Sequence, residues 1–486
     1  MTFSPISQGG PYRGGHYHGN FLGITLWGAG MELLPDAGYV TSQAAYRYPN
    51  QDVVFHNAGW VTSQNMDYTG DNTNKYTRPS LLAYDPGDVS DKQVQLLEAS
   101  EPGPVEDLVD IKRRLLMMVK IDGNRSYVLD LQRMKGGDAH ENFLRASEEE
   151  DCDLSTSLEL EEHGGTLADY LKSNPIGLNT YRSYMSEPRS AEGDEAFDFT
   201  WKGQQSGSSL HVFMNGIENS EVYFSRIPTA RRAGNKAELR DNYPGWHFYR
   251  RRLVNDTDIT RYGAVYESYR DTQTALVKNV KWMDAEPYDS QSIVCVVETE
   301  EYEDTIYISN DNVKRSANGY DFSGTTCMVR KNKDSQTAEW GYIYGEGQIV
   351  GNGIEVTGEE DKKFRILSVS DSIKDGEKNE IKIEGSLSGN TSLNGVWART
   401  IFGDKSGWGL KIKSIDQNTI ETEQHPAFEI TEEGAKMLFF PAKSLNGILT
   451  AAIGGDVTPL SEYEDVVIKG QPWLEIKTPT FVTKFR

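Results

Sequence analysis

The chain has 486 residues, 37% of them hydrophobic and 25% charged, which is typical of a globular protein with room for two or three domains. Its formal net charge of −23 argues against a nucleic-acid partner, because nucleic acids bind to basic surfaces. The sequence has no run of 18 apolar residues, so it predicts no membrane span. Its three scattered cysteines are too few for a disulfide framework. Residues 1–5 lack the basic and apolar segments of a secretion signal.

Histidines gather near the N-terminus, with one aspartate between them. His16 and His18 are two residues apart, so in a strand both side chains point to one side. Asp36 and His56 can join them from neighbouring strands, and this set suffices for a metal site beside a proton-transfer group. Its nitrogen and oxygen donors suit zinc or a similar divalent ion. The alternative is that these histidines are half-buried and only form hydrogen bonds.

The rest of the chain is dominated by short segments rich in β-branched and aromatic residues, separated by Gly, Asn and Asp turns. Several segments alternate apolar and polar residues, which is typical of stacked antiparallel sheets with one buried face. The clearest are 127–131, 221–224, 305–308, 364–369, 380–383, 409–413 and 466–468. Helical spacing is scarce. It appears at 108–118, and one or two helical turns are expected at 166–171 and 431–437.

Two acidic, turn-rich zones interrupt this pattern, at 148–153 and 359–363. Both are expected to be solvated loops. The second is the expected domain boundary, because the repeated Ile-Lys-Ile texture beyond it indicates a separate β-domain. The sequence therefore predicts an all-β protein, with a large two-layer antiparallel β-sandwich at 1–360 and a smaller β-domain at 361–486.

The N-terminal motifs resemble the heparinase II/III-type polysaccharide lyases. The resemblance is carried by 16–21, 23–27, 32–39 and 56–57, continues through 97–104, 113–116, 126–131 and 135–140, and covers most of the first 360 residues. It also favours a strand over a helix at 113–121. Two positions depart from the family: Asn20 stands where an acidic residue is usual, and Ala58 where threonine is usual.

The resemblance implies roles for individual residues. His16 matches the family's catalytic histidine, and His18, Asp36 and His56 match its ligands for a zinc ion with a largely structural role. A catalytic tyrosine is expected between the last two ligands, where Tyr46 and Tyr48 both lie, with a core or rim aromatic as the equal alternative for each.

Further residues are candidates for contacts with substrate or with the metal ligands. Arg13 lies beside the histidine motif, Asn20 lies within it, and His140 follows two glycines as in the family, with packing as its alternative. Asn57 is expected either to orient the neighbouring histidine or to be a turn residue. The arginines at 47, 78, 113–114 and 250–252 are further candidates, but most are expected to be solvated surface charges.

The implied activity is β-elimination on acidic polysaccharides that contain uronate, such as a glycosaminoglycan. The site must neutralise the sugar carboxylate, remove the proton at C5 and protonate O4 as it leaves. Histidine suits the base because it is neutral near pH 7, and tyrosine suits proton delivery to the leaving oxygen.

An N-terminal α-helical toroid supplies much of the substrate cleft in this family, and the sequence contains nothing resembling it. A separate or missing toroid domain is therefore an expected partner. A polymeric substrate implies a periplasmic or secreted protein. Two alternatives remain: a non-catalytic carbohydrate-binding or structural β-module, and, last, a glycoside hydrolase, which needs two facing carboxylates.

Overall fold

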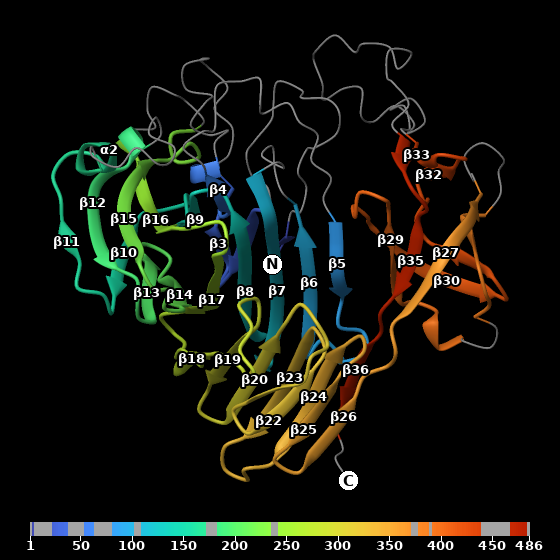
Figure 1. Cartoon of the computed structure of the whole chain (residues 1–486). Helices are drawn as coiled ribbons and strands as arrows, with labels where there is room; N and C mark the ends of the chain where they lie inside the picture. The colour runs from blue at the N-terminus through green and yellow to red at the C-terminus, as the bar shows by residue number, and fades with distance from the viewer. Residues whose placement is uncertain are drawn as a thin grey trace. The chain divides into compact units, whose positions relative to one another are not determined.

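The computed structural model describes residues 2–3, 22–36, 53–62, 80–101, 108–171, 182–234, 242–370, 378–387, 391–438 and 467–483. Regular structure in these ranges is almost entirely antiparallel β, which confirms the all-β prediction. None of the helices described there is long and apolar enough to cross a membrane. The chain divides into two compact units, Met1–Gly358 with Pro479–Arg486 and Glu359–Thr478 (Figure 1). The second unit begins two residues before the expected boundary, and the last strand belongs to the first unit.

The first unit contains four large antiparallel sheets. In order of adjacent strands, the central sheet consists of β10 (Cys152–Thr156), β13 (Phe197–Gly203), β14 (Ser208–Met214), β17 (Ile259–Arg270), β8 (Arg125–Gly136), β7 (Val109–Asp122), β6 (Val94–Ser100) and β5 (Ser80–Asp85). The outer sheet consists of β11 (Glu161–Glu162), β12 (Ser186–Glu192), β15 (Ser220–Pro228), β16 (Pro244–Leu253), β9 (Ala139–Arg145) and β4 (Gly59–Thr62).

The third sheet consists of β18 (Asn279–Met283), β19 (Ile293–Glu298), β20 (Tyr302–Ile308), β23 (Thr326–Asn332), β24 (Ala338–Tyr344) and β36 (Pro479–Val482). The fourth consists of β21 (Arg315–Ala317), β22 (Tyr320–Ser323), β25 (Gln348–Gly351) and β26 (Ile354–Thr357). The described residues of this unit also contain a small sheet of β1 (Thr2–Phe3), β2 (Ile24–Gly28) and β3 (Met31–Leu34) and the short helices η2 (Val53–Phe55), α2 (Leu167–Tyr170) and η5 (Arg182–Tyr184).

The four large sheets stack in layers, so this unit has more layers than the two expected. Side chains of the outer and central sheets share one hydrophobic core, those of the central and third sheets a second, and those of the third and fourth sheets another. The burial of strand β7 explains why the spacing of its apolar residues resembles that of a helix. Leu116 packs in the first core and Leu115 and Met117 in the second, so both faces of the strand are apolar. The strand favoured at 113–121 is confirmed.

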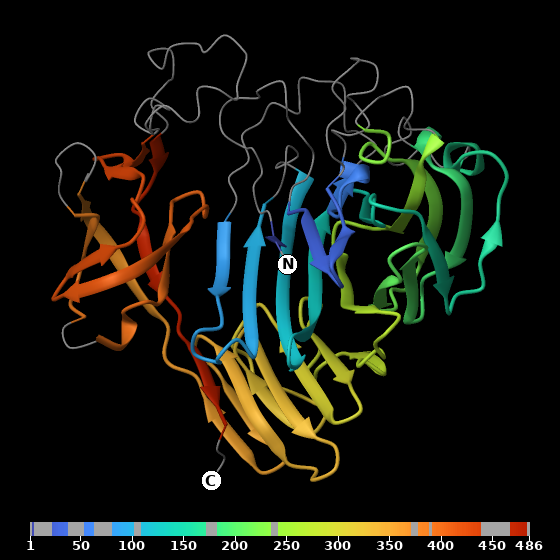
Figure 2. The same ribbon diagram turned by 180° about the vertical axis from the view of Figure 1, so that it is seen from behind.

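The second unit is a small closed barrel with a three-stranded sheet beside it (Figure 2). The barrel order is β27 (Lys362–Val369), β28 (Glu380–Ile383), β31 (Thr419–Thr422), β30 (Gly409–Asp416), β29 (Trp397–Ile401) and β35 (Trp473–Ile476), which pairs again with β27. The other strands are β32 (Phe428–Ile430), β33 (Gly434–Met437) and β34 (Val467–Lys469), and η7 spans Thr391–Leu393. Inward-pointing isoleucines and leucines fill the barrel core.

The two expected helical segments have opposite outcomes. Residues 167–170 form α2, because the Thr166 hydroxyl and the Asp169 carboxylate cap the first turn reciprocally. The helical turn expected at 431–437 is wrong. Gly434 has a φ of +152° and opens strand β33, which pairs on both sides with neighbouring strands.

Several charged residues of the first unit are buried, contrary to two expectations. Arg114, Arg250 and Arg251 are buried rather than solvated, because each guanidinium group has carboxylate, hydroxyl or carbonyl acceptors. The zone at 148–153 is likewise not a solvated loop. Glu148 is buried in an ion pair with Arg145, and Glu150 accepts backbone N–H groups of the turn at 205–206.

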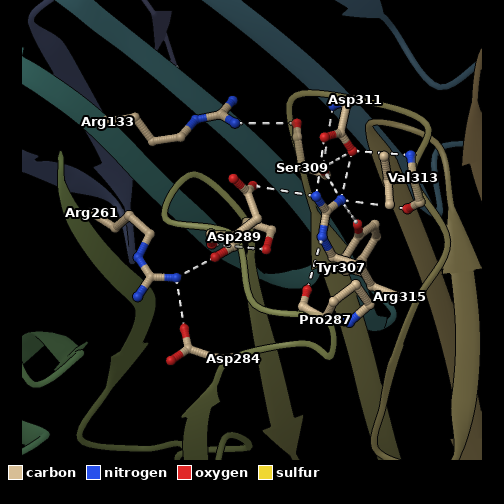
Figure 3. A network of polar contacts seen from close by, with 11 residues as sticks. Arg133, Arg261, Asp284, Pro287, Asp289, Tyr307, Ser309, Asp311, Val313 and Arg315 are labelled. Carbon is tan, nitrogen blue, oxygen red and sulfur yellow. Dashed lines mark hydrogen bonds and ion pairs between the residues drawn. The ribbon is translucent and has the colours of Figure 1, made fainter.

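A polar junction joins the central sheet to two loops of the third and fourth sheets (Figure 3). Arg133 of β8 donates to the Ser309 carbonyl at 3.2 Å, and Arg261 of β17 donates to Asp284 at 2.8 Å. Arg315 binds both carboxylate oxygens of Asp311, at 2.6 and 3.0 Å. These bonds pair each cation with a carboxylate or carbonyl group of the protein, so the junction is a structural element.

Candidate functional site

Two of the predicted metal ligands meet in the structure. Asp36 follows β3, His56 follows η2, and the His56 Nδ1 atom lies 3.0 Å from the Asp36 Oδ2 atom. The His56 side chain is 1% exposed and the Asp36 side chain 34% exposed, so the pair has one buried and one accessible member. The predicted residues at positions 13, 16, 18, 20, 46 and 48 lie outside the described residues.

Asn57 links the two segments that carry this pair. Its Nδ2 group donates to the Pro35 carbonyl at 2.7 Å and to the Ile24 carbonyl at 3.0 Å, and its Oδ1 atom accepts from the Arg145 backbone N–H at 2.8 Å. The side chain is buried, and all three bonds join segments distant in sequence. Asn57 therefore fixes the residue before Asp36 relative to the residue after His56.

Buried side chains hold the backbone of residues 54–57. His247 Nε2 lies 2.7 Å from the Val54 carbonyl, Arg145 donates to the Phe55 carbonyl at 2.7 Å, and Arg114 donates to the Asn57 carbonyl at 2.6 Å. Burial lowers the pKa of His247 to about 3, so its ring is neutral at physiological pH and its Nε2–H donates. The donors come from both the central and the outer sheets, so the segment is fixed by the sandwich itself.

Arg114 connects both halves of the site to the core. Besides the Asn57 carbonyl it donates to the Leu22 carbonyl at 2.7 Å, at the start of β2. Its other nitrogens bind both oxygens of Asp130 at 2.9 and 2.6 Å, and the Tyr266 hydroxyl donates to the same carboxylate at 2.8 Å. This charge-assisted pairing makes a guanidinium group tolerable in the interior.

The geometry of the pair is compatible with a zinc site. Two ligands of a tetrahedral zinc ion with bonds of about 2.0–2.1 Å lie about 3.3 Å apart, close to the spacing of these two atoms. An imidazole nitrogen and a carboxylate oxygen are also donors that zinc accepts. No group of three or more such side chains gathers among the described residues, so a third donor would come from beyond them, where His18 lies. The same 3.0 Å spacing is that of a hydrogen bond, so both alternatives fit.

His140 lies in the interior rather than on an accessible surface. Its Nδ1 atom is 2.7 Å from the Thr260 hydroxyl and its Nε2 atom is 2.9 Å from the Gly136 carbonyl. Burial lowers the pKa of His140 to about 4, so the ring is neutral near pH 7. These are the contacts of a packing residue, the alternative to substrate binding that the sequence left open.

Sequence reasoning missed the buried residues that support the pair. His247 carries no motif, and Arg145 ends a strand in which polar and apolar residues are mixed. A weak signal existed for Arg114, because it directly precedes the apolar run 115–119 of a predicted strand. An arginine at such a position is buried in a sheet only when its charge is paired. Lys112 was missed as well. Its ammonium lies 4.8 Å from the centroid of the Trp60 ring, and burial lowers its pKa to about 8.

No family model matches the chain, and no curated protein matches it. Part of the structure is similar to solved polysaccharide lyases. The heparan sulfate lyase HepC from Pedobacter heparinus matches with 9% identity and a TM-score of 0.37, over 58% of this chain and 35% of that chain. Two heparinase III structures match with 13% and 12% identity and TM-scores of 0.36, over 60% of this chain and 36% of theirs. The match spans about a third of the length of these structures. Likeness at this level assigns neither a family nor an activity.

Proposed function

We propose that this chain is the β-sheet part of a polysaccharide lyase that cleaves uronate-containing acidic polysaccharides by β-elimination. The observation that carries the proposal is the contact between Asp36 and His56 at 3.0 Å. These residues are 20 positions apart, and both belong to the motifs that resemble the heparinase II/III-type lyases. A partly exposed carboxylate against a buried imidazole is also the arrangement expected of an accessible metal-binding edge.

The proposed reaction requires a base, an acid and a positive charge. His16 takes the C5 proton, the C5–H electron pair forms the C4=C5 double bond, and the C4–O4 bond breaks. Tyr46 or Tyr48 gives a proton to O4, and Arg13 and Asn20 contact the sugar. Neutralising the uronate carboxylate is needed because the C5 proton is very weakly acidic while that group is charged.

We further propose that His18, Asp36 and His56 bind zinc, which would tie the strand ends of the site together when bound. The protein's own residues do the remaining work. Asn57 and Arg114 fix the backbone on either side of the pair. A helical toroid domain, on this or another chain, would complete the cleft. Because the substrate is a polymer, the proposal places the protein in the periplasm or outside the cell.

The test is a lyase assay on the full chain, alone and within the complete gene product. Polymers of glucuronate, galacturonate, mannuronate and sulfated uronate are incubated with it, and the ultraviolet absorbance of an unsaturated uronate is followed. His16→Ala should abolish the rise in absorbance while leaving the zinc content unchanged. The matched control is His163→Ala, whose imidazole bonds the Ser190 hydroxyl in the outer sheet, and it should remain active. No absorbance rise from the complete protein across the panel contradicts the proposal.

A further inference from the structure

The closed barrel of the second unit carries an ordered set of outward side chains on three adjacent strands. The register of β27, β35 and β29 places Arg365 opposite Trp473 and Trp473 opposite Ile401. The next outward row places Lys363 opposite Glu475 and Glu475 opposite Arg399. Opposed residues of antiparallel strands point to the same side, so these six residues form one surface, which we call the barrel face.

The barrel face contains exposed apolar groups. Trp473 is 37% exposed, although tryptophan usually buries most of its surface. Leu367, the next outward residue on β27 and a neighbour of the barrel face, is 47% exposed. The alternate residues of β35, Leu474 and Ile476, point inward and are buried in the barrel core. The exposure of the indole therefore follows from strand alternation rather than from a fraying end.

The charge of the barrel face is opposite to that of its surroundings. Residues 359–478 contain 20 acidic and 14 basic side chains, so the unit as a whole is acidic. On the barrel face three cations meet one carboxylate, and that carboxylate is already paired, with Glu475 Oε2 lying 2.7 Å from Arg399 Nε.

Lys363 and Arg365 are exposed and form no ion pair with any side chain in the described ranges. The Lys363 ammonium lies 5.4 Å from the centroid of the Trp473 ring. The two cations therefore lie beside the indole, and the one carboxylate of the barrel face, Glu475, is paired with Arg399 instead.

We propose that the barrel face binds an anionic polysaccharide. The indole offers a flat apolar surface for the C–H groups of a sugar ring, and the flanking cations bind its carboxylates. Lys363 and Arg365 are two positions apart on one strand, about 6.7 Å, so they contact charges on successive parts of an extended chain. The identity of the polymer as a uronate rests on the proposed function. The barrel face would hold the polymer without taking part in its cleavage.

The test measures equilibrium binding of polygalacturonate to the full chain by calorimetry at low salt. Lys363→Gln with Arg365→Gln, and separately Trp473→Ala, should each raise Kd about ten-fold. The matched control is Lys378→Gln with Lys413→Gln. This variant also removes two positive charges, from the lysines that pair with Glu421 of β31. In the six-strand order of the barrel, β31 lies opposite β35. The control variant should change Kd by less than about two-fold. Thermal unfolding of each variant verifies folding.

Several results would overturn the inference. If the control double variant raises Kd as much, the effect depends only on net charge and not on the barrel face. If the unmodified protein does not bind the polymer, the barrel face is not a polysaccharide site. Tighter binding to duplex DNA or to phosphatidylserine vesicles would assign the barrel face to another class of partner. Binding needs no turnover, so retained binding with a failed lyase assay refutes the proposed function alone. An active lyase whose binding is unaffected by these variants refutes this inference alone.

Discussion

Replacing Asn57 by alanine is the sharpest perturbation of the framework under the Asp36–His56 pair. The substitution removes three buried hydrogen bonds and leaves two carbonyl groups and one N–H without their partner. At roughly 1 kcal/mol for each bond, the free energy of unfolding should fall by about 3 kcal/mol. For a unit of this size the midpoint temperature should fall by about 4 °C. Because the Pro35 carbonyl loses its anchor, the affinity of the site for zinc should fall as well.

The matched control is Asn215→Ala, in the same unit but away from the pair. Asn215 is also buried, donates to the Arg261 carbonyl at 2.8 Å and accepts from the Gly263 N–H at 2.9 Å. Urea unfolding should show a loss of about 2 kcal/mol, with zinc content unchanged. A free energy of unfolding for Asn57→Ala within about 0.5 kcal/mol of the unmodified protein, or equal loss of zinc from both variants, would contradict this role of Asn57.

Three further outcomes are expected. Arg114→Met should destabilise the fold by about 3–5 kcal/mol, because it leaves the buried Asp130 carboxylate without its cation, and denaturant unfolding would measure the loss. The pKa of His140 falls from about 6.5 in the unfolded chain to about 4 in the fold, so the folded state binds fewer protons. Stability should therefore be lost as pH falls from about 6.5 to about 4, by about 3 kcal/mol from this residue. In His140→Gln that part of the slope should vanish. All three cysteines are buried free thiols, so they should react with a thiol reagent only after unfolding, and rapid labelling of the native protein would contradict their placement.

The strand pattern was predictable because it depends on local alternation. Residues 364–369 and 409–413 alternate inward and outward side chains, and they became β27 and β30 of the barrel. The number of stacked sheets was harder to predict from the sequence. A strand buried on both faces, such as β7, loses its alternation, and only the partners of Leu115 and Leu116 reveal two different cores.

The buried charges were the main failure of sequence reasoning, and the cause is physical. The isolated sequence shows Arg114 after two other cations, at the start of an apolar run, but its partner Asp130 lies on the next strand. The same holds for Arg145 and Glu148, where the cation is three positions before a carboxylate that looks like part of a solvated loop. A charged side chain is buried when residues of opposite charge or hydrogen-bonding groups lie next to it in the fold. The sequence alone does not show which residues become its neighbours.

The sequence predicted which residues form the candidate site, but not the buried residues that hold them in place. The motif named Asp36 and His56, and the fold brings them within 3.0 Å. Asn57 was left between a positioning residue and a turn residue, and its three long-range bonds show that it positions the segment. His247 could not be identified, because a histidine that bonds a distant backbone carbonyl leaves no pattern in the sequence.

The most direct test of the proposed metal site is X-ray absorption at the zinc edge on the intact protein, with metal content measured in parallel. Zinc near one equivalent per chain, with two imidazole nitrogens and a carboxylate oxygen around it, is the expected result. Both the metal and that signature should disappear in His18→Ala and in His56→Ala. A folded protein that takes up no zinc, or whose zinc survives the loss of both imidazoles, would mean that Asp36 and His56 form only a hydrogen bond.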